Sequence, residues 1–210
     1  MSQMPLSFCY AVLSGGKSSR MGRDKSLLSV GGQSIVERVV GDIQGFTAAQ
    51  EQLYLCSGGK RYSQLDSENL IYLDDYLADY QGPLSALAAV FQSVALNSKF
   101  DYQWVFTFPT DSLLLPSETF SLLQQAIEKN PEAQMVYLSG ERDHPLHAAY
   151  RVEIAEALVS YLADDHRAVM KFVQQLDYKR VQIPNHWQAY LNFNTEVGFK
   201  KAVEAYNQAN

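Results

Sequence analysis

The sequence predicts an α/β protein in which helices cover both faces of a mostly parallel sheet. Short apolar runs alternate with longer segments of helical periodicity, which is the pattern of βαβ crossover units. Hydrophobic residues make up 47% and charged residues 19% of the chain, as in a globular protein with a sizeable core. At 210 residues and without an internal repeat or linker, we expect one domain over residues 1–210.

The strands are predicted from short apolar runs at 7–13, 52–56, 69–73, 102–108, 133–138, 146–151 and 179–183, with a further short strand at 189–192. The helices are predicted from apolar periodicity at 33–44, 83–96, 117–129, 152–163, 166–176 and 194–207. Pro83 suits the first turn of a helix, Ser117 is an N-cap candidate, and Asn130 before Pro131 ends the helix that precedes it. The polar segment 139–147 lies between two strands and is where a departure from simple alternation is most expected.

Four predicted strand ends carry side chains or loops suited to a polar ligand. A basic loop follows the first strand, Cys56 begins a Ser-Gly-Gly loop, Asp75 follows the third strand, and Asp111 follows the fourth. Ligands of open α/β sheets bind outside the carboxyl ends of the strands, at a topological switch point. We therefore expect these four segments to meet at one rim.

The basic loop, Leu13 to Lys25, is the most informative segment. Its glycines allow close approach of backbone N–H groups to an anion. Its charged residues sum to +3 in a chain of net charge −6, which points to a small polyanion such as a nucleoside triphosphate. The Walker A pattern is absent, because five residues separate Gly16 from Gly22 and Arg23 follows. The Rossmann glycine pattern is also absent, because Gly15 and Gly16 are adjacent and the next glycine is Gly22. The alternative is a solvated polar loop, which remains open for Lys17 and Arg23.

The segment Leu13-Ser14-Gly15-Gly16-Lys17-Ser18-Ser19-Arg20-Met21-Gly22-Arg23-Asp24-Lys25 resembles the L-[AS]-G-G-x-S-x-R-M-G-x-D-K loop of the nucleotidyltransferase superfamily. Further segments resemble molybdenum cofactor guanylyltransferases in the family's order, namely Asp74-Asp75-Tyr76, Leu77–Leu84, Phe108-Pro109-Thr110-Asp111, Gly140–Pro145 and Asn192–Thr195. The resemblance spans nearly the whole chain. It implies a three-layer, Rossmann-like nucleotidyltransferase fold.

The resemblance also implies an activity, the transfer of GMP from GTP to the molybdenum-molybdopterin cofactor with release of pyrophosphate. Mg²⁺ is the implied metal. The part of the chain up to about residue 111 would bind the nucleotide, and the remainder mainly the acceptor. Chaperones of molybdoenzymes and other cofactor-biosynthesis proteins are implied as further partners.

Residue roles follow from the matching positions. Arg20, Lys25 and Asp111 are expected to be catalytic; the nucleotide-binding set is Leu13, Ser14, Gly15, Gly16, Lys25, Cys56, Asp75, Gly82 and Asp111; and the acceptor-binding set is Arg142, Asp143, His144, Asn192 and Asn194. Cys56 departs from the Asn that is frequent in the family, and Ala86 stands where a second glycine is frequent.

Asp111 is the expected metal ligand. From position alone, an aspartate after an apolar strand either meets the cleft or caps the next helix, and the resemblance of Phe108-Pro109-Thr110-Asp111 to the family's metal-binding strand end favours the metal. Arg142 is either an acceptor ligand or part of a surface turn. His144 and His147 do not have the spacing of a metal site on a helix.

Two alternatives remain open. The same scaffold could use CTP or a sugar-phosphate acceptor, or the protein could be a non-catalytic carrier of nucleotide or cofactor. The acidic balance argues against nucleic acid as a partner. No apolar run reaches 18 residues and no signal-peptide layout precedes residue 8, so a cytoplasmic location without membrane contact is expected. Cys9 and Cys56 are expected to be small buried hydrophobic residues.

Overall fold

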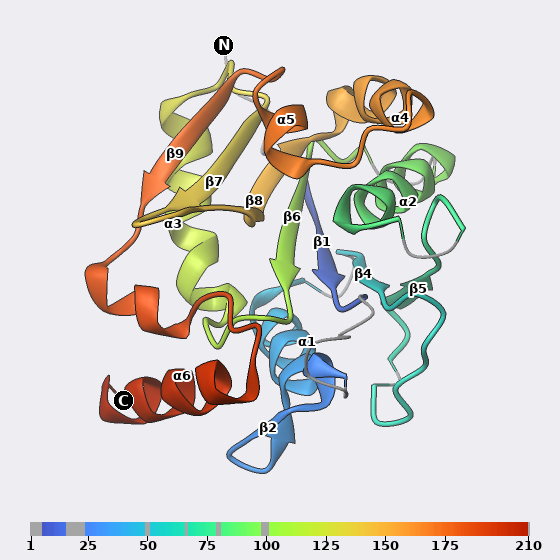
Figure 1. Ribbon diagram of the computed structural model, residues 1–210. Coiled ribbons are helices and arrows are strands. Elements are labelled where there is room, and N and C mark those ends of the chain that lie inside the picture. The colour runs from blue at the N-terminus through green and yellow to red at the C-terminus, as the bar shows by residue number, and fades with distance from the viewer. Residues whose placement is uncertain are drawn as a thin grey trace.

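A seven-stranded sheet forms the centre of the computed structural model, which describes residues 6–15, 24–48, 51–65, 67–78, 81–97 and 101–209 (Figure 1). The strands of this sheet are β1 (Phe8–Leu13), β4 (Leu53–Cys56), β5 (Leu70–Leu73), β6 (Trp104–Pro109), β7 (Met135–Ser139), β8 (Asp143–Arg151) and β9 (Tyr178–Gln182). They lie in the order β5-β4-β1-β6-β8-β7-β9. Only β8 is antiparallel to its neighbours, β6 and β7, so the predicted mostly parallel, mixed sheet is confirmed.

Helices cover both faces of the sheet. They are α1 (Ile35–Phe46), α2 (Pro83–Leu96), α3 (Pro116–Lys129), α4 (Ala155–Ala163), α5 (Val169–Val173) and α6 (Glu196–Ala209). Buried residues of α1, α3 and α6 share one hydrophobic cluster, and those of α2, α4 and α5 share another. The two clusters meet opposite faces of the sheet, which gives three layers.

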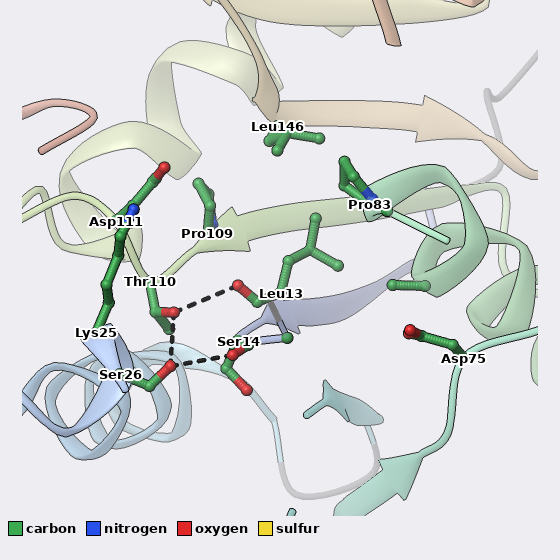
Figure 2. A pocket seen from close by; sticks show the side chains of 13 residues that line it. Leu13, Ser14, Lys25, Ser26, Asp75, Pro83, Pro109, Thr110, Asp111 and Leu146 are labelled. Carbon is green, nitrogen blue, oxygen red and sulfur yellow. Dashed lines mark hydrogen bonds between the residues drawn. The ribbon is translucent and has the colours of Figure 1, made fainter. Parts of the chain in front are cut away.

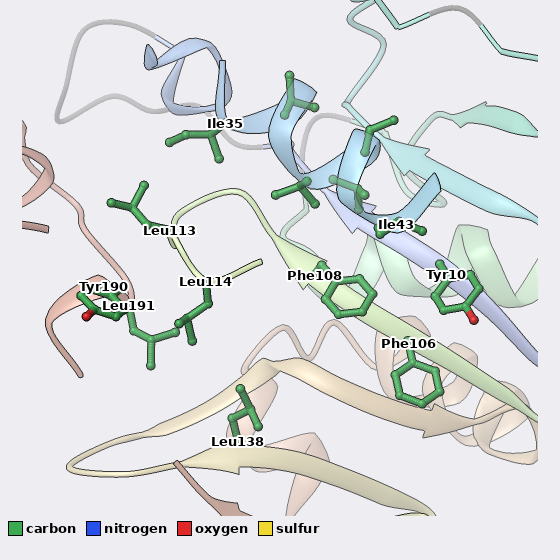
Figure 3. Close-up of a cluster of buried hydrophobic side chains, with 14 of the residues drawn as sticks. Tyr10, Ile35, Ile43, Phe106, Phe108, Leu113, Leu114, Leu138, Tyr190 and Leu191 are labelled. Atoms are coloured by element: carbon green, nitrogen blue, oxygen red, sulfur yellow. The ribbon is translucent and has the colours of Figure 1, made fainter. Parts of the chain in front are cut away.

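The central strands are apolar along their whole length because both of their faces are covered. All six residues of β6 are buried. Alternate residues of β1 enter different clusters, Val12 the α1 side and Ala11 the α2 side. Figure 3 shows Tyr10, Phe106 and Phe108 of the first cluster beneath α1.

A small hairpin that the sequence analysis did not predict precedes α1. It pairs β2 (Ser29–Val30) with β3 (Gln33–Ser34) through Gly31 and Gly32, whose φ angles of 60° and 88° are the left-handed values of a two-residue turn. The helix predicted from residue 33 therefore begins at Ile35. Ser34 is its N-cap in a capping box, in which the Ser34 N–H donates to Glu37 at 2.7 Å.

The polar segment 139–147 departs from βα alternation, as expected. It turns β7 directly into β8, and the pairing of these strands shifts register between Tyr137 and Leu138. Tyr137 pairs with Ala148 whereas Leu138 pairs with His144, so residues 145–147 of β8 are left out of the pairing with β7.

Three local predictions were wrong: the strand at 189–192, the N-cap at Ser117 and the length of the helix at 166–176. The segment 189–192 is not a strand; a 3₁₀ helix, η3 (Asn185–Tyr190), ends there and is followed by a loop. Its apolar residues Tyr190 and Leu191 are buried against Leu113 and Leu114 instead of pairing with a strand, as Figure 3 shows. The apolar run therefore reflects tertiary burial.

Ser117 is not the N-cap of α3, and the helix predicted at 166–176 is shorter. Leu115 precedes the first residue, Pro116, and Ser117 binds α1 by donating its N–H and hydroxyl to the Asp42 carboxylate at 2.7 and 2.9 Å. The helix α5 covers only Val169–Val173. The short 3₁₀ helices η1 (Lys25–Leu27) and η2 (Val152–Ile154) complete the fold.

Candidate active site

A cavity of about 320 Å³ lies at the carboxyl ends of β1 and β6, where the strand order reverses. Its lining residues are Leu13, Ser14, Gly15, Lys25, Ser26, Asp75, Gly82, Pro83, Ala86, Pro109, Thr110, Asp111 and Leu146. Figure 2 shows Lys25 and Asp111 on one side of it and Asp75 on the opposite side. Three of the four expected strand ends thus contribute residues to one cavity.

The end of β1 is held by its neighbour β4. The Ser14 N–H donates to the Cys56 carbonyl at 3.0 Å, and the Tyr62 hydroxyl lies 3.4 Å from the Ser14 Oγ. Ser14 is buried, whereas Gly15 is exposed at the rim. The chain therefore leaves the sheet at Gly15 and enters the basic loop at the cavity edge.

A buried pair of hydroxyls joins the basic loop to both central strands (Figure 2). The Ser26 Oγ lies 3.0 Å from the Thr110 Oγ1 and donates to the Ser14 carbonyl at 3.1 Å. The Thr110 N–H donates to the Leu13 carbonyl at 3.2 Å. These contacts bring Lys25, which precedes Ser26, back to the cavity.

Lys25 and Asp111 supply the charges on one side of the cavity. The Lys25 Nζ donates to the Asn194 Oδ1 at 2.7 Å. Burial raises the pKa of Asp111, and the positive charge of Lys25 partly opposes this. Within the described part of the chain, the Asp111 carboxylate forms no ion pair with Lys25 and accepts no hydrogen bond from another side chain.

Asp75 lies on the opposite side. Burial raises its pKa, and the neighbouring charge of Asp74 adds to the effect. Gly82 precedes α2 with a φ of 93°, a left-handed value that favours glycine, and Pro83 takes the first helical position. Ala86 lines the cavity one turn further along α2, so its methyl group narrows the space that a glycine would leave.

Cys56 lies beneath the cavity, outside its lining. Its thiol is fully buried and lies 3.7 Å from the Ala86 carbonyl, and burial raises its pKa. Both cysteines are free and buried, which confirms the expectation that they are small core residues. The contribution of Cys56 to the site is its backbone carbonyl, which orients Ser14.

The residues of the 140–144 hairpin lie outside the cavity lining. Arg142 is exposed at the tip, next to the turn in which the Gly140 N–H donates to its carbonyl. Asp143 forms a bidentate ion pair with Arg180 at 3.1 and 3.2 Å. Although burial raises the pKa of Asp143, hydrogen bonds from Arg180 and Ser139 outweigh this and hold the pKa below its usual value. Asp143 is thus engaged by Arg180 of β9 and by Ser139 of β7.

His144 is buried and lies near a second histidine, His147, at a ring-centroid distance of 6.4 Å. Burial lowers the pKa of His144, and it lowers the pKa of His147 to about 3. The Nε2 of His144 and both ring nitrogens of His147 have no hydrogen-bond partner among the described residues. The lowered pKa values favour the neutral form of both imidazoles.

The loop 191–195 lies beside Asp111. The Phe193 N–H donates to the Asp111 carbonyl at 3.0 Å, and Asn192 adopts a left-handed φ of 55°. The Asn194 Nδ2 donates to the Asn192 Oδ1 at 2.8 Å, while its Oδ1 faces Lys25. Of the expected acceptor-binding residues, Asn194 is hydrogen-bonded to a charged residue of the cavity, and Asn192 is hydrogen-bonded to Asn194.

Two expected site residues, Gly16 and Arg20, lie outside the described residues, as do Lys17 and Arg23. Ser26, Pro83, Pro109, Thr110 and Leu146 line the cavity but were not among the predicted site residues. Ser26 and Thr110 each adjoin a predicted residue, Lys25 or Asp111, so proximity in sequence was a usable signal. Nothing in the sequence indicated the ion pair of Lys60 with Asp24 at 2.6 Å, because the two residues lie in separate loops.

The described residues hold no group of three or more His, Cys, Asp or Glu side chains placed to bind a metal ion. Within the same part of the chain, no helix has the length and apolar character needed to cross a membrane.

The fold and the position of its cavity define a three-layer α/β protein with a cavity at the switch point of the sheet. A solved structure with this fold is the molybdopterin-guanine dinucleotide biosynthesis protein A from Archaeoglobus fulgidus, at a TM-score of 0.70 and 17% identity, with 95% of this chain and 98% of that chain covered. This likeness concerns the fold.

Sequence comparison identifies the family. Residues 10–181 match the model of the MobA-like NTP transferase domain, and the chain belongs to this family. It is 30% identical over 196 residues to the molybdenum cofactor guanylyltransferase of Pasteurella multocida, covering 92% of this chain and 98% of the relative. It is 28% identical over 204 residues to that of Haemophilus influenzae (strain 86-028NP), covering 95% of this chain and all of the relative.

Proposed function

We propose that this protein transfers GMP from GTP to the molybdenum-molybdopterin cofactor, releasing pyrophosphate and forming the guanine dinucleotide. The observation that carries the proposal is the cavity at the switch point, where Lys25 and Asp111 stand opposite Asp75. Relatives named molybdenum cofactor guanylyltransferase match over nearly the full length of both chains, which supports this reaction.

In the proposed reaction, a phosphate oxygen of the acceptor forms a bond to the α-phosphorus of GTP. The bond from that phosphorus to the β-phosphate oxygen breaks, and pyrophosphate leaves with the bonding electron pair. Both reactants are anions, so the protein must neutralise charge and align the groups. Lys25 is proposed to bind the triphosphate at the cavity, and Arg20, on sequence resemblance alone, to assist as a planar phosphate ligand.

The carboxylate of Asp111 is proposed to hold Mg²⁺. The donor set fits, because Mg²⁺ is usually bound by one or two carboxylates together with substrate phosphates and water. A partly buried carboxylate that accepts no hydrogen bond from a described side chain, beside a lysine proposed to bind phosphate, meets that requirement. When bound there, Mg²⁺ would neutralise charge on the phosphates and on Asp111 itself.

The two sides of the cavity suggest an orientation for GTP. The triphosphate would lie toward Lys25 and Asp111, along Ser14 and Gly15, and the nucleoside toward Leu13, Asp75 and Gly82. Gly16 is proposed as a further phosphate contact on sequence resemblance alone. The raised pKa of Asp75 indicates a desolvated carboxylate that hydrogen-bond donors on the nucleotide would stabilise. Cys56 acts in this arrangement by holding the Ser14 backbone.

The acceptor is proposed to bind beside Asn192 and Asn194 and toward the hairpin that carries Arg142. Arg142 is exposed and suited to a phosphate group. Because Asp143 is engaged by Arg180, its proposed part is to hold the hairpin in shape beneath the acceptor, next to His144. The chain up to about residue 111 would then serve the nucleotide, and the remainder mainly the acceptor.

The test is pyrophosphate release from GTP and Mg²⁺, with and without molybdenum cofactor, and with CTP in parallel. Release that requires both GTP and the cofactor is the expected result. Release with CTP and not GTP would replace guanylyl by cytidylyl transfer. Tight nucleotide binding without release would instead favour the carrier function or another acceptor.

A further inference from the structure

The Lys25 ammonium is held by a residue 169 positions further along the chain. Its Nζ donates to the Asn194 Oδ1 at 2.7 Å, and Asn194 in turn donates its Nδ2 to the Asn192 Oδ1 at 2.8 Å. The orientation of the Asn194 amide follows from chemistry, since a lysine can only donate and the Asn194 oxygen must face it. The NH₂ group is then left for Asn192.

The loop that carries Asn194 is itself fixed beside the cavity. The Phe193 N–H donates to the Asp111 carbonyl at 3.0 Å, and the Leu113 N–H donates to the Tyr190 carbonyl at 2.9 Å. The Phe193 ring is buried and packs on Phe199 of α6 at a centroid distance of 5.1 Å. Asn194 therefore stands on a supported segment, which suits a residue that positions another.

The choice of partner for Lys25 has a chemical consequence. Asp111 lies close enough for the charge of Lys25 to act on it, yet the lysine hydrogen-bonds to a neutral amide. A direct ion pair would leave both groups less available to an incoming triphosphate and its metal. A neutral acceptor orients the ammonium while leaving its positive charge uncompensated.

We infer that Asn194 is a positioning residue for the nucleotide, which keeps Lys25 aimed into the cavity and apart from Asp111. This inference rests on the proposed function and extends it, because it assigns to the nucleotide side a residue otherwise expected to serve the acceptor. Without the Asn194 amide, the ammonium is free to pair with the Asp111 carboxylate. Triphosphate binding then requires that pair to be broken first.

The test is a double-mutant cycle on triphosphate affinity, measured by titration calorimetry with GTP and Mg²⁺ and without any acceptor. The variants are Lys25→Ala, Asn194→Ala and the double variant, with Asn185→Ala as a matched control on the exposed surface of the same C-terminal region. We expect Asn194→Ala to weaken binding about tenfold, and to change it less than about twofold when Lys25 is already alanine. Asn185→Ala should bind like wild type.

A second variant separates positioning from simple support of the loop. Asn194→Asp keeps the shape of the side chain but gives Lys25 a charged partner, so it should weaken triphosphate binding at least as much as Asn194→Ala. Asn194→Gln, which keeps the amide, should recover part of the affinity. A purely structural role predicts that the near-isosteric Asp variant binds normally, and it would be supported if only the melting temperature changed.

The inference is overturned if Asn194→Ala binds triphosphate like wild type. It is also overturned if the Asn194→Ala substitution weakens triphosphate binding by the same factor in wild type and in Lys25→Ala. Wild-type affinity for triphosphate in Asn194→Ala, together with a raised KM for the acceptor in the pyrophosphate-release assay, would return Asn194 to the acceptor site alone. Because no acceptor is present in the titration, a wrong acceptor would leave the result unchanged. If wild type binds neither GTP nor CTP, both the proposed function and this inference fail.

Discussion

Replacing Ser26 by alanine tests whether the buried hydroxyl pair ties the basic loop to the sheet. Ser26 and Thr110 carry one hydroxyl proton each, but three contacts compete for them, at 3.0, 3.1 and 3.4 Å. The two shorter contacts form a consistent chain in which Thr110 donates to Ser26 and Ser26 donates to the Ser14 carbonyl. Ser26→Ala removes both of these, and Thr110 falls back on its long contact to the Leu13 carbonyl.

The expected loss of stability follows from the number of hydrogen bonds that Ser26→Ala removes. Each lost hydrogen bond is worth about 1 kcal/mol net, and the Ser14 carbonyl loses a donor in a buried place, which costs about 1–3 kcal/mol when no other donor replaces it. Allowing for the fallback of Thr110, we expect the free energy of unfolding to drop by about 2 kcal/mol. For a protein of this size that corresponds to a melting temperature lower by about 4–8 °C.

Urea and thermal unfolding of the variant measure this change. Ser29→Ala is the matched control, because Ser29 is exposed in the adjacent hairpin and should lie within about 0.5 kcal/mol of wild type. Thr110→Ser retains a hydroxyl, so its free energy of unfolding should lie between those of Ser26→Ala and Ser29→Ala. If Ser26→Ala were as stable as Ser29→Ala, the hydroxyl pair would not be what anchors the basic loop to the sheet.

Three further predictions concern charged residues. Lys25→Ala should slow turnover at least about tenfold with little change in melting temperature; a smaller loss would make Lys25 a solvated residue. Asp111→Asn should abolish Mg²⁺-dependent turnover without lowering stability at pH 7. Because burial raises the pKa of Asp111, its ionisation destabilises the folded state as pH rises through that pKa. The free energy of unfolding of Asp111→Asn should therefore exceed that of wild type at neutral pH and equal it below pH of about 4, as measured by acid and urea unfolding. A lower free energy of unfolding for Asp111→Asn than for wild type at pH 7 would refute this. Asp143→Asn should lose less than about 1 kcal/mol at pH 7, since the pair with Arg180 is partly exposed, and the loss should disappear as acid protonates Asp143. A raised KM for the acceptor at unchanged stability would instead make Asp143 an acceptor ligand.

The seven strands of the central sheet and the helices between them were predictable from the amino-acid pattern alone. Strands such as β6 are buried on both faces, so their apolar runs stand out locally. The meeting of Ser14, Asp75 and Asp111 at one rim was equally predictable, because parallel strands bring their carboxyl ends to the same edge. The ends of two helices were also visible, since Pro83 and Pro131 restrict the backbone beside them.

Some local structure was predictable in principle but was missed. The hairpin at Gly31 and Gly32 carries a recognisable two-glycine turn, although its strands are only two residues long. At 189–192, the residues that are buried against Leu113 and Leu114 are apolar, so the segment has the apolar run expected of a strand. Periodicity reports burial, and burial alone does not say which element the residues form.

The pairing of the polar side chains in the site depends on tertiary packing and was not predictable from the sequence. Ser26 meets Thr110 across 84 residues, Lys25 meets Asn194 across 169, and Asp24 meets Lys60 across 36. Tertiary packing also placed Cys56 beneath the cavity and engaged Asp143 with Arg180. Hydrophobic patterning is periodic along the chain and fixes which face of an element is buried, but a hydrogen bond requires two atoms within about 3 Å, and that proximity exists only after distant segments have packed.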